Sequence, residues 1–440
     1  MTRLNCSSPG SKENKKARLE RLLRELDALL TEEYDDAEDP GTIDAIEAES
    51  DRVAESVRRI VADKLLKKKQ HQAQQQSGAR QWTCPCGQPA RYVGLRPRQL
   101  VLRSGAHTVV RAYFHCATCR QGVYPLDACL KLGAGQYSPP VAAVMARLNA
   151  YLPDRQAAKE LQLLWGIDPA VSTLQRYSRR AGDKIAQEWQ TRQEDSREER
   201  LPESRVYPKR LHVTMDGVQV HVDGAWHEAK IAAIYELDGR EHAVNTQYTA
   251  TMKPSSELGQ RLPVLAHHAG ADHCRDVAVV ADGGPWIWQE TARYFPLSVQ
   301  VLDYYHACQH LWAASHARYG EGTQASKEWA TELKALLYEE KQSELRRQLR
   351  SWQPHNQAKS TVRRRLLNYL QEHRGRMAYK SLKAKGYHIG SGVIEASCKN
   401  VVQGRMKRAG MRWSRPGAEA MLHTCSHYWS AGNAGFRNYV

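Results

Sequence analysis

Leu211-His-Val-Thr-Met-Asp216 and Val277-Ala-Val-Val-Ala-Asp282 are the stretches that decide the fold. The first alternates apolar and polar residues, which is typical of a half-buried strand. The second is a short, continuous apolar run, which is typical of a central strand. Each ends in an aspartate followed by glycine. Because acids at the ends of central strands converge at one edge of a sheet, we expect Asp216 and Asp282 to lie close together.

The residues around these strands predict an α/β domain over 205–440. Further strand candidates are Ile231–Tyr235, Thr246–Met252 and Leu297–Leu302. After them, apolar residues recur at helical spacing over a long block. This order predicts a mixed sheet whose domain carries an all-α insertion at about 318–386.

A third acid, Glu395, follows Gly390-Ser-Gly-Val-Ile, which indicates a glycine-flanked helix start. Taken singly, such acids are more often turn or helix-start residues. Three carboxylates in a small space repel one another unless cations neutralise them. Hard oxygen ligands suit Mg²⁺ or Mn²⁺, and two such ions about 4 Å apart can activate an attacking oxygen and stabilise a leaving one. Their order and settings favour a two-ion site at Asp216, Asp282 and Glu395.

The segments around these acids also resemble a known family. They are Val213-Thr-Met-Asp216-Gly-Val218, Val280-Ala-Asp282-Gly-Gly-Pro-Trp-Ile-Trp288, Leu302-Asp303-Tyr-Tyr-His306-Ala307 and Ile389-Gly-Ser-Gly-Val-Ile-Glu395-Ala-Ser-Cys-Lys399. They resemble the ISKra group of bacterial insertion-sequence transposases, which is similar to the mutator-like and hAT-like Asp–Asp–Glu enzymes.

This resemblance implies a ribonuclease H-like catalytic domain with Asp216, Asp282 and Glu395 as the catalytic triad. Asp303-x-x-His306 matches an Asp/Cys-x-x-His signature that follows the second acid in such enzymes. His306 is therefore a candidate for positioning a phosphate or an acid, and a structural histidine is the alternative. The helical block before Glu395 matches an insertion that those relatives carry.

A basic tail follows Glu395, and its stretch Gly404–Ser414 also resembles the family. We expect its cations to contact backbone phosphates and its tryptophan to stack on an exposed base. The candidate residues are Lys399, Arg405, Lys407, Arg408, Arg412 and Trp413. The alternative is a solvated basic helix with the tryptophan in the core.

Two close cysteine pairs lie in a module over 82–130. Thiolates from Cys84, Cys86, Cys116 and Cys119 can hold one structural zinc ion, as in a zinc ribbon. The first pair has one intervening residue where two are usual. We therefore keep open that His107, His115 or Cys129 replaces one ligand, or that the thiols are buried and free.

The segment 131–200 indicates three helices with a short turn at Trp165-Gly166-Ile167. The last is polar and basic, which fits a helix-turn-helix that docks in a major groove. Arg176 and Arg179 are its candidate DNA contacts. An ordinary helical bundle is the alternative.

The N-terminal region 1–66 carries leucines at helical spacing among charges, beginning at Leu19. It predicts a helical hairpin within one chain or, as the alternative, an oligomerisation coil. Residues 67–81 are rich in Gln and Lys, which favours a linker.

The 440 residues carry a formal net charge of +16, and an excess of that size usually meets a polyanion such as DNA. The sequence has no apolar run of about 18 residues and no signal-peptide pattern at its start. We therefore expect a cytoplasmic, nucleoid-associated bacterial protein with thiols rather than disulfides.

Together these features predict a transposase that cleaves and joins DNA at the ends of a mobile element, as a homodimer or higher homo-oligomer. Two alternatives remain. One is a structure-specific nuclease on the same fold, and the other is a DNA-binding regulator derived from a transposase. Clustered acids weigh against a pure binder, because they would face anionic DNA.

Overall fold

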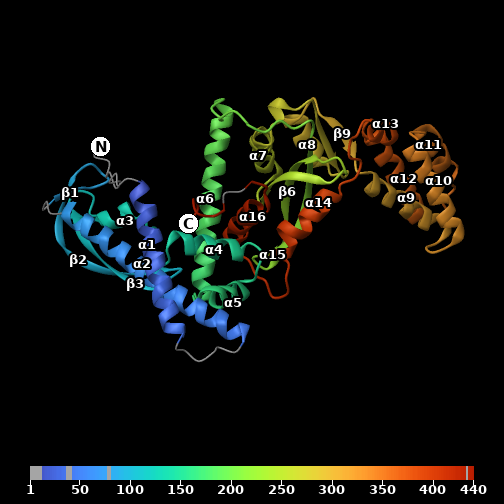
Figure 1. Ribbon diagram of the computed structural model, residues 1–440. Coiled ribbons are helices and arrows are strands. Elements are labelled where there is room, and N and C mark those ends of the chain that lie inside the picture. Colours follow the sequence, from blue (N-terminus) through green and yellow to red (C-terminus); the bar gives the residue numbers. More distant parts are fainter. Residues whose placement is uncertain (1–11, 36–41, 77–80, 433–434) are drawn as a thin grey trace. The chain divides into compact units, whose positions relative to one another are not determined.

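A computed structural model describes residues 12–35, 42–76, 81–432 and 435–440, and the chain forms two compact units (Figure 1). The first contains residues 1–142 and 161–167, and the second contains 143–160 and 168–440. Each unit is described by itself.

The first unit is built on a long antiparallel hairpin. Its sheet has the order β1-β2-β3-β4, and the short outer strands pair only with the ends of the hairpin. Its elements are α1 (Lys12–Asp35), α2 (Ile43–Gln76), β1 (Gln81–Thr83), β2 (Pro89–Leu102), β3 (Gly105–Cys116), β4 (Gly122–Val123) and α3 (Pro125–Cys129).

Helix α2 extends into the segment expected to be a linker. The linker over 67–81 is helical as far as Gln76, and residues 77–80 lie outside the described part of the chain. Two contacts explain the difference. Ala73 is buried with Leu100 of β2, and the Gln70 side chain accepts a hydrogen bond of 2.9 Å from the Val110 backbone N–H. Lys and Gln also have good helix propensity.

The three helices expected as a separate module over 131–200 are divided between the units. They are α4 (Pro139–Asn149), α5 (Asp154–Trp165) and α6 (Val171–Arg197). Helix α6 packs closely on α16 (Arg415–Trp429), because a Cβ at Gly182 would lie 2.1 Å from the Ala420 carbonyl oxygen. The third helix is thus part of the second unit's core.

A five-stranded mixed sheet forms the centre of the second unit. Its order is β7-β6-β5-β8-β9, with β5, β8 and β9 parallel and β6 antiparallel to both of its neighbours. The strands are β5 (Leu211–Val222), β6 (Ala225–Leu237), β7 (Ala243–Thr251), β8 (Val277–Ala281) and β9 (Val299–Leu302). They include every strand candidate of the sequence.

Two hydrophobic cores cover the two faces of this sheet. Along β5, Leu211, Val213 and Met215 belong to one core, and Val218 and Val220 belong to the other. The first core is closed by η1 (Ala271–His273) and by α7 (Ser255–His268), α8 (Pro285–Tyr294) and α9 (Tyr304–Tyr319). The second is closed by α14 (Gly392–Ser397), the π-helical turn η3 (Cys398–Gln403), α15 (Gly404–Met406) and α16.

Every regular element from Gln324 to Ala384 is helical, which agrees with the insertion expected at about 318–386. The helices are α10 (Gln324–Tyr338), α11 (Gln342–Ser351), α12 (Gln357–Glu372), η2 (Arg374–Arg376) and α13 (Tyr379–Ala384). Their buried leucines and tryptophans continue the first core.

Candidate functional site

Asp216 lies within β5, not at its end as expected, because the strand runs on to Val222. Gly217 makes room within the strand rather than forming a turn. A Cβ at this position would lie 2.1 Å from Oε1 of Glu228 on β6, so any larger residue would clash with that side chain in its present position. Side chains alternate along a strand, so Asp216 shares the face of Val218 and points toward η3. On that face, its Oδ2 lies 3.3 Å from Sγ of Cys398, which donates to it.

Asp282 directly follows β8, as predicted. Its Oδ1 accepts a hydrogen bond of 2.9 Å from the Gly284 backbone N–H, which fixes the turn into α8. Burial raises the pKa of Asp216, and the negative charges of Asp282 and Glu228 raise it further. The two aspartates thus belong to neighbouring parallel strands of the sheet.

Glu395 is an exposed residue on α14. It lines a cavity of about 620 Å³ together with Tyr305 and His388. Cys398 begins the next turn, and burial raises the pKa of its thiol, as do the nearby Asp216, Glu395 and Asp282. The negative charges of all three predicted acids therefore raise the pKa of this one thiol.

The three acids do not, however, form a compact ligand set. Among the described residues, only the four cysteines of the first unit bring three or more possible metal ligands within 4.8 Å of one another. The arrangement of the acids does not by itself support a Mg²⁺ or Mn²⁺ site.

Asp303 links the end of β9 to the loop before Glu395. Its Oδ1 caps α9 by accepting from the backbone N–H groups of Tyr305 (2.6 Å) and His306 (3.0 Å). Its Oδ2 accepts from the backbone N–H of Ser391 at 3.1 Å and from the Ser391 hydroxyl. The first residue of the Asp-x-x-His signature therefore has a structural role that fixes the start of α14.

His306 begins a series of ring contacts that the sequence analysis did not identify. Its ring lies 5.0 Å from that of His310, which lies 4.3 Å from Tyr369, which in turn lies 4.8 Å from His373. The i, i+4 spacing of the two histidines on α9 was the feature that could have revealed the first contact.

These rings lie beside Asp282. A Cβ at Gly283 would come within 2.6 Å of the Tyr369 ring and 3.1 Å of His373 Nε2, so glycine permits the close approach. Burial lowers the pKa of His310, and Asp282 acts in the opposite direction. Neutral imidazoles can donate or accept hydrogen bonds, which suits them to orient a carboxylate or a phosphate.

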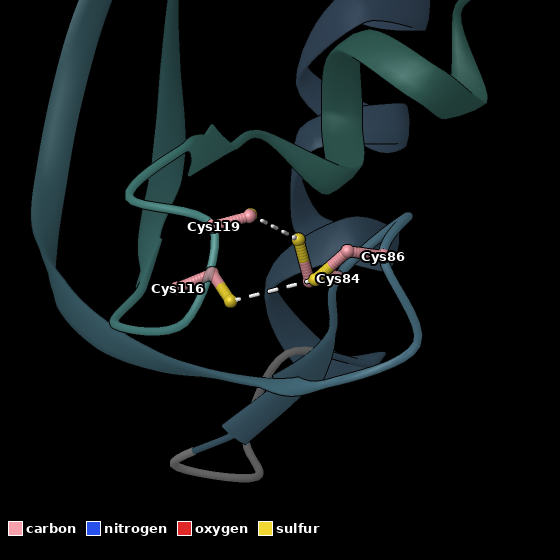
Figure 2. Close-up of side chains that lie close together, drawn as sticks. All are labelled: Cys84, Cys86, Cys116 and Cys119. Atoms are coloured by element: carbon pink, nitrogen blue, oxygen red, sulfur yellow. Dashed lines mark hydrogen bonds between the residues drawn. The ribbon is translucent and has the colours of Figure 1, made fainter.

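The four predicted cysteines come together in one cluster, in which each cysteine of the first pair lies close to one of the second (Figure 2). Sγ of Cys84 lies 3.5 Å from that of Cys119, and Sγ of Cys86 lies 3.7 Å from that of Cys116. Four thiolates at 2.3 Å from one zinc ion would be about 3.8 Å apart. The cluster can therefore hold a metal ion, and its sulfur donors are compatible with structural zinc.

The short first pair is accommodated by a tight turn. The Gly87 N–H donates to the Cys84 carbonyl at 2.8 Å, and Gly87 has a φ of +85°, which glycine adopts at little cost. His107 is not a ligand, because its Nδ1 lies 2.6 Å from Oδ1 of Asp63 and its Nε2 lies 2.9 Å from Oγ of Ser104.

Most of the predicted DNA-contacting cations are exposed. They are Arg176 and Arg179 on α6, and Lys399, Lys407, Arg408 and Arg412 in the tail. Arg408 is partly engaged, since its guanidinium donates to the carbonyls of Gly404 (2.6 Å) and Tyr151 (3.1 Å).

The prediction that Arg405 contacts DNA is wrong, because only 1% of this residue is exposed. Its guanidinium donates to the backbone carbonyl of Asn149 (2.7 Å), to that residue's Oδ1 (2.9 Å) and to Oδ1 of Asp154 (2.7 Å). It also lies over the ring of Trp413, whose Nε1–H donates to the Met406 carbonyl at 3.1 Å. Trp413 is thus packed and hydrogen-bonded, as in the alternative interpretation.

No helix among the described residues is long and apolar enough to cross a membrane.

Two comparisons place the chain among known sequences. The family model described as "Uncharacterised protein family (UPF0236)" matches residues 87–438. The "UPF0236 protein in vanSb 3′region" of Streptococcus gallolyticus is 26% identical over 314 residues, which are 68% of this chain. The matched part is 65% of that relative, a little less than two thirds of its length.

Proposed function

We propose that this chain, which belongs to the uncharacterised protein family UPF0236, is a DNA transposase with a ribonuclease H-like catalytic domain. In this proposal it cleaves phosphodiester bonds at the ends of a mobile element and joins a freed 3′-hydroxyl to target DNA. Asp216, Asp282 and Glu395 are the catalytic acids.

One observation carries the proposal. Asp216 on β5 and Asp282 directly after β8 belong to neighbouring parallel strands, and the buried Cys398 thiol, one turn after Glu395, donates to Asp216 at 3.3 Å. Acids that repel in a half-buried place destabilise a protein unless they bind something cationic. A mixed sheet that presents such acids is also what the resemblance to Asp–Asp–Glu transposases implies.

The donor chemistry fits divalent cations, since carboxylate oxygens are the ligands that Mg²⁺ and Mn²⁺ prefer. Asp216 and Asp282 would hold the ions, and Glu395 would complete the set. When bound, the ions supply activation of the attacking oxygen and stabilisation of the leaving one.

Other residues of the chain would bind DNA and orient the catalytic groups. Exposed Lys407 and Arg412 can contact backbone phosphates, and Arg176 and Arg179 offer a second basic surface on α6. His306 and His310 can orient Asp282 or a phosphate through their ring nitrogens. In the first unit, the four cysteines would hold zinc in a structural role, because a closed four-ligand site leaves no position for substrate.

The test is a strand-transfer assay with labelled DNA that carries the sequences flanking the gene, a plasmid target and Mg²⁺ or Mn²⁺. We expect cleaved ends and joined products from the wild type. Asp216→Asn and Asp282→Asn should abolish both while DNA binding persists. Asp272→Asn, an exposed aspartate in η1, is the matched control and should be fully active.

The same assay separates the alternatives. Cleavage without joining would identify a nuclease. DNA binding without cleavage by the wild type would identify a regulator. Normal cleavage by Asp282→Asn would refute the assignment of the acids.

A further inference from the structure

Helix α1 carries an uncovered apolar stripe. Leu19, Leu22 and Leu29 are 57%, 49% and 62% exposed, and Leu23 beside them is 55% exposed. With Leu26, the first three repeat with spacings of three and four residues, which is the a/d pattern of a helix that pairs with another. A stripe of this kind on a single chain marks an interaction surface.

The N-terminal part of α2, residues 43–60, also carries exposed apolar side chains. Ile43, Ile46 and Ile60 are 67%, 49% and 59% exposed. The second half is held against β3, where Asp63 meets His107 and the core covers Ala73. Helix α2 is thus anchored at one end and leaves its apolar residues uncovered at the other.

Charge shows which partner fits α1. Its first half carries Arg18, Arg21 and Arg24 against one glutamate, Glu20, among residues 17–24, and its second half carries Glu25, Asp27 and Glu32. Helix α2 has the reverse order, with acids at Glu47, Glu49 and Asp51 and cations at Arg58, Arg59 and Lys64. The end of α1 does contact α2, since the Tyr34 hydroxyl donates to Oε1 of Glu49 at 2.6 Å. A full antiparallel hairpin of α1 along α2 would nevertheless set like charges side by side, which is destabilising.

We propose that α1 pairs antiparallel with α1 of a second copy of this chain, about a two-fold axis near Arg24. The basic half of each helix then meets the acidic half of the other. In this register Leu19 lies across from Leu29 of the second copy, and Leu22 lies across from Leu26. Arg18 and Glu32 flank this stripe, and Arg18 of one copy lies beside Glu32 of the other. A two-fold interface of this kind is self-complementary and closes as a dimer.

The length of α1 is sufficient for such a pair. Its 24 residues span about 36 Å at 1.5 Å per residue. Most of the stability of a helix in a protein comes from packing of its apolar face, which the leucine stripe would supply here. This inference is independent of the proposed catalytic activity, since it uses only residues of α1 and α2.

The test is sedimentation velocity of the full chain without DNA. We expect a dimer from the wild type. Leu22→Lys with Leu29→Lys should weaken dimerisation by about 100-fold or more, because each copy then brings two charges, four in all, into the packed seam. The melting temperature of the rest of the chain should not change. Leu297→Lys is the matched control, since that leucine is 98% exposed and lies outside α1; it should remain dimeric.

Charge exchange tests the antiparallel register. Arg18→Glu alone and Glu32→Arg alone should each weaken the dimer, and the double variant should restore it, because each pair then regains opposite charges. A monomeric wild type, or a dimer that the leucine substitutions leave intact, would overturn the proposal. A double variant weaker than both single ones would overturn the antiparallel register.

Discussion

Substitution of Asp303 tests how the candidate site is held together. This carboxylate is 2% exposed and accepts hydrogen bonds from three backbone N–H groups and one hydroxyl. Two of these donors begin α9, and the other two belong to Ser391, directly before α14. Asp303→Ala should therefore loosen both helices at once.

The loss of stability caused by Asp303→Ala can be estimated from these hydrogen bonds. Loss of a helix N-cap costs about 1 kcal/mol. Ser391 is 6% exposed, and a buried donor left without its charged partner costs about 1–3 kcal/mol. The Ser391 hydroxyl can rotate to another acceptor, so we count one stranded donor. Asp303→Ala should thus lower the free energy of unfolding by about 2–4 kcal/mol. Asp303→Asn should cost less, because its amide oxygen can still cap α9.

Two measurements check this result. Urea denaturation gives the loss of stability, and hydrogen exchange should become faster at the amides of Ser391 and α14. Thr323→Ala removes the cap of α10, where Oγ1 accepts from the Ser326 N–H at 3.2 Å, and serves as the control. It should cost about 1 kcal/mol and leave exchange at α14 unchanged. The reasoning is refuted if Asp303→Ala costs less than Thr323→Ala, or if exchange at α14 stays at the wild-type rate.

Two further predictions concern metal and DNA. Elemental analysis of the purified protein should find one zinc per chain, and Cys86→Ser should lose it and unfold the first unit, since structural zinc contributes folding free energy; protein without zinc would refute the ligand set. Lys407→Ala with Arg412→Ala should reduce the slope of log affinity for DNA against log salt by about one per lost contact. Arg405→Met should instead lower the melting temperature and leave that slope unchanged, and an altered slope at wild-type stability would contradict its structural role.

The strands of the second unit could be predicted from sequence because their patterns are local. Alternation over Leu211–Asp216 and the apolar run at Val277–Ala281 follow directly from burial on one face or on both. The cysteine cluster was equally accessible, since each pair sits on one tight turn. In these cases the residues that decide the structure are neighbours in the chain.

The position of Asp216 could not be read in the same way. The Asp-Gly pair has the composition of a strand end, yet here the glycine makes room for Glu228 on the adjacent strand. That requirement depends on the register between β5 and β6, which pairs Gly217 with Lys230. Pairing register is a tertiary property, and a turn propensity carries no information about it.

The histidine contacts beside Asp282 were missed for a related reason. His306 and His310 are one turn apart on α9, but Tyr369 and His373 come from α12, within the helical insertion. The sequence gives no reason to place that helix against the turn after β8. Gly283 is the residue near Asp282 in the sequence that permits the approach of Tyr369 and His373. A glycine after an aspartate, however, is explained more simply by a turn.

Arg405 shows why a basic run cannot be treated as one surface. A guanidinium has five N–H donors, so it can satisfy several buried carbonyl and carboxylate oxygens at once. Its acceptors, Asn149 and Asp154, lie about 250 residues earlier in the chain, so the sequence near Arg405 gives no sign of them. The tail folds around this buried cation. Trp413 packs against the second core there, and its indole N–H donates to the Met406 carbonyl. In the proposed function, the cations that remain exposed on either side of Arg405 would contact phosphates from a segment that this buried arginine anchors.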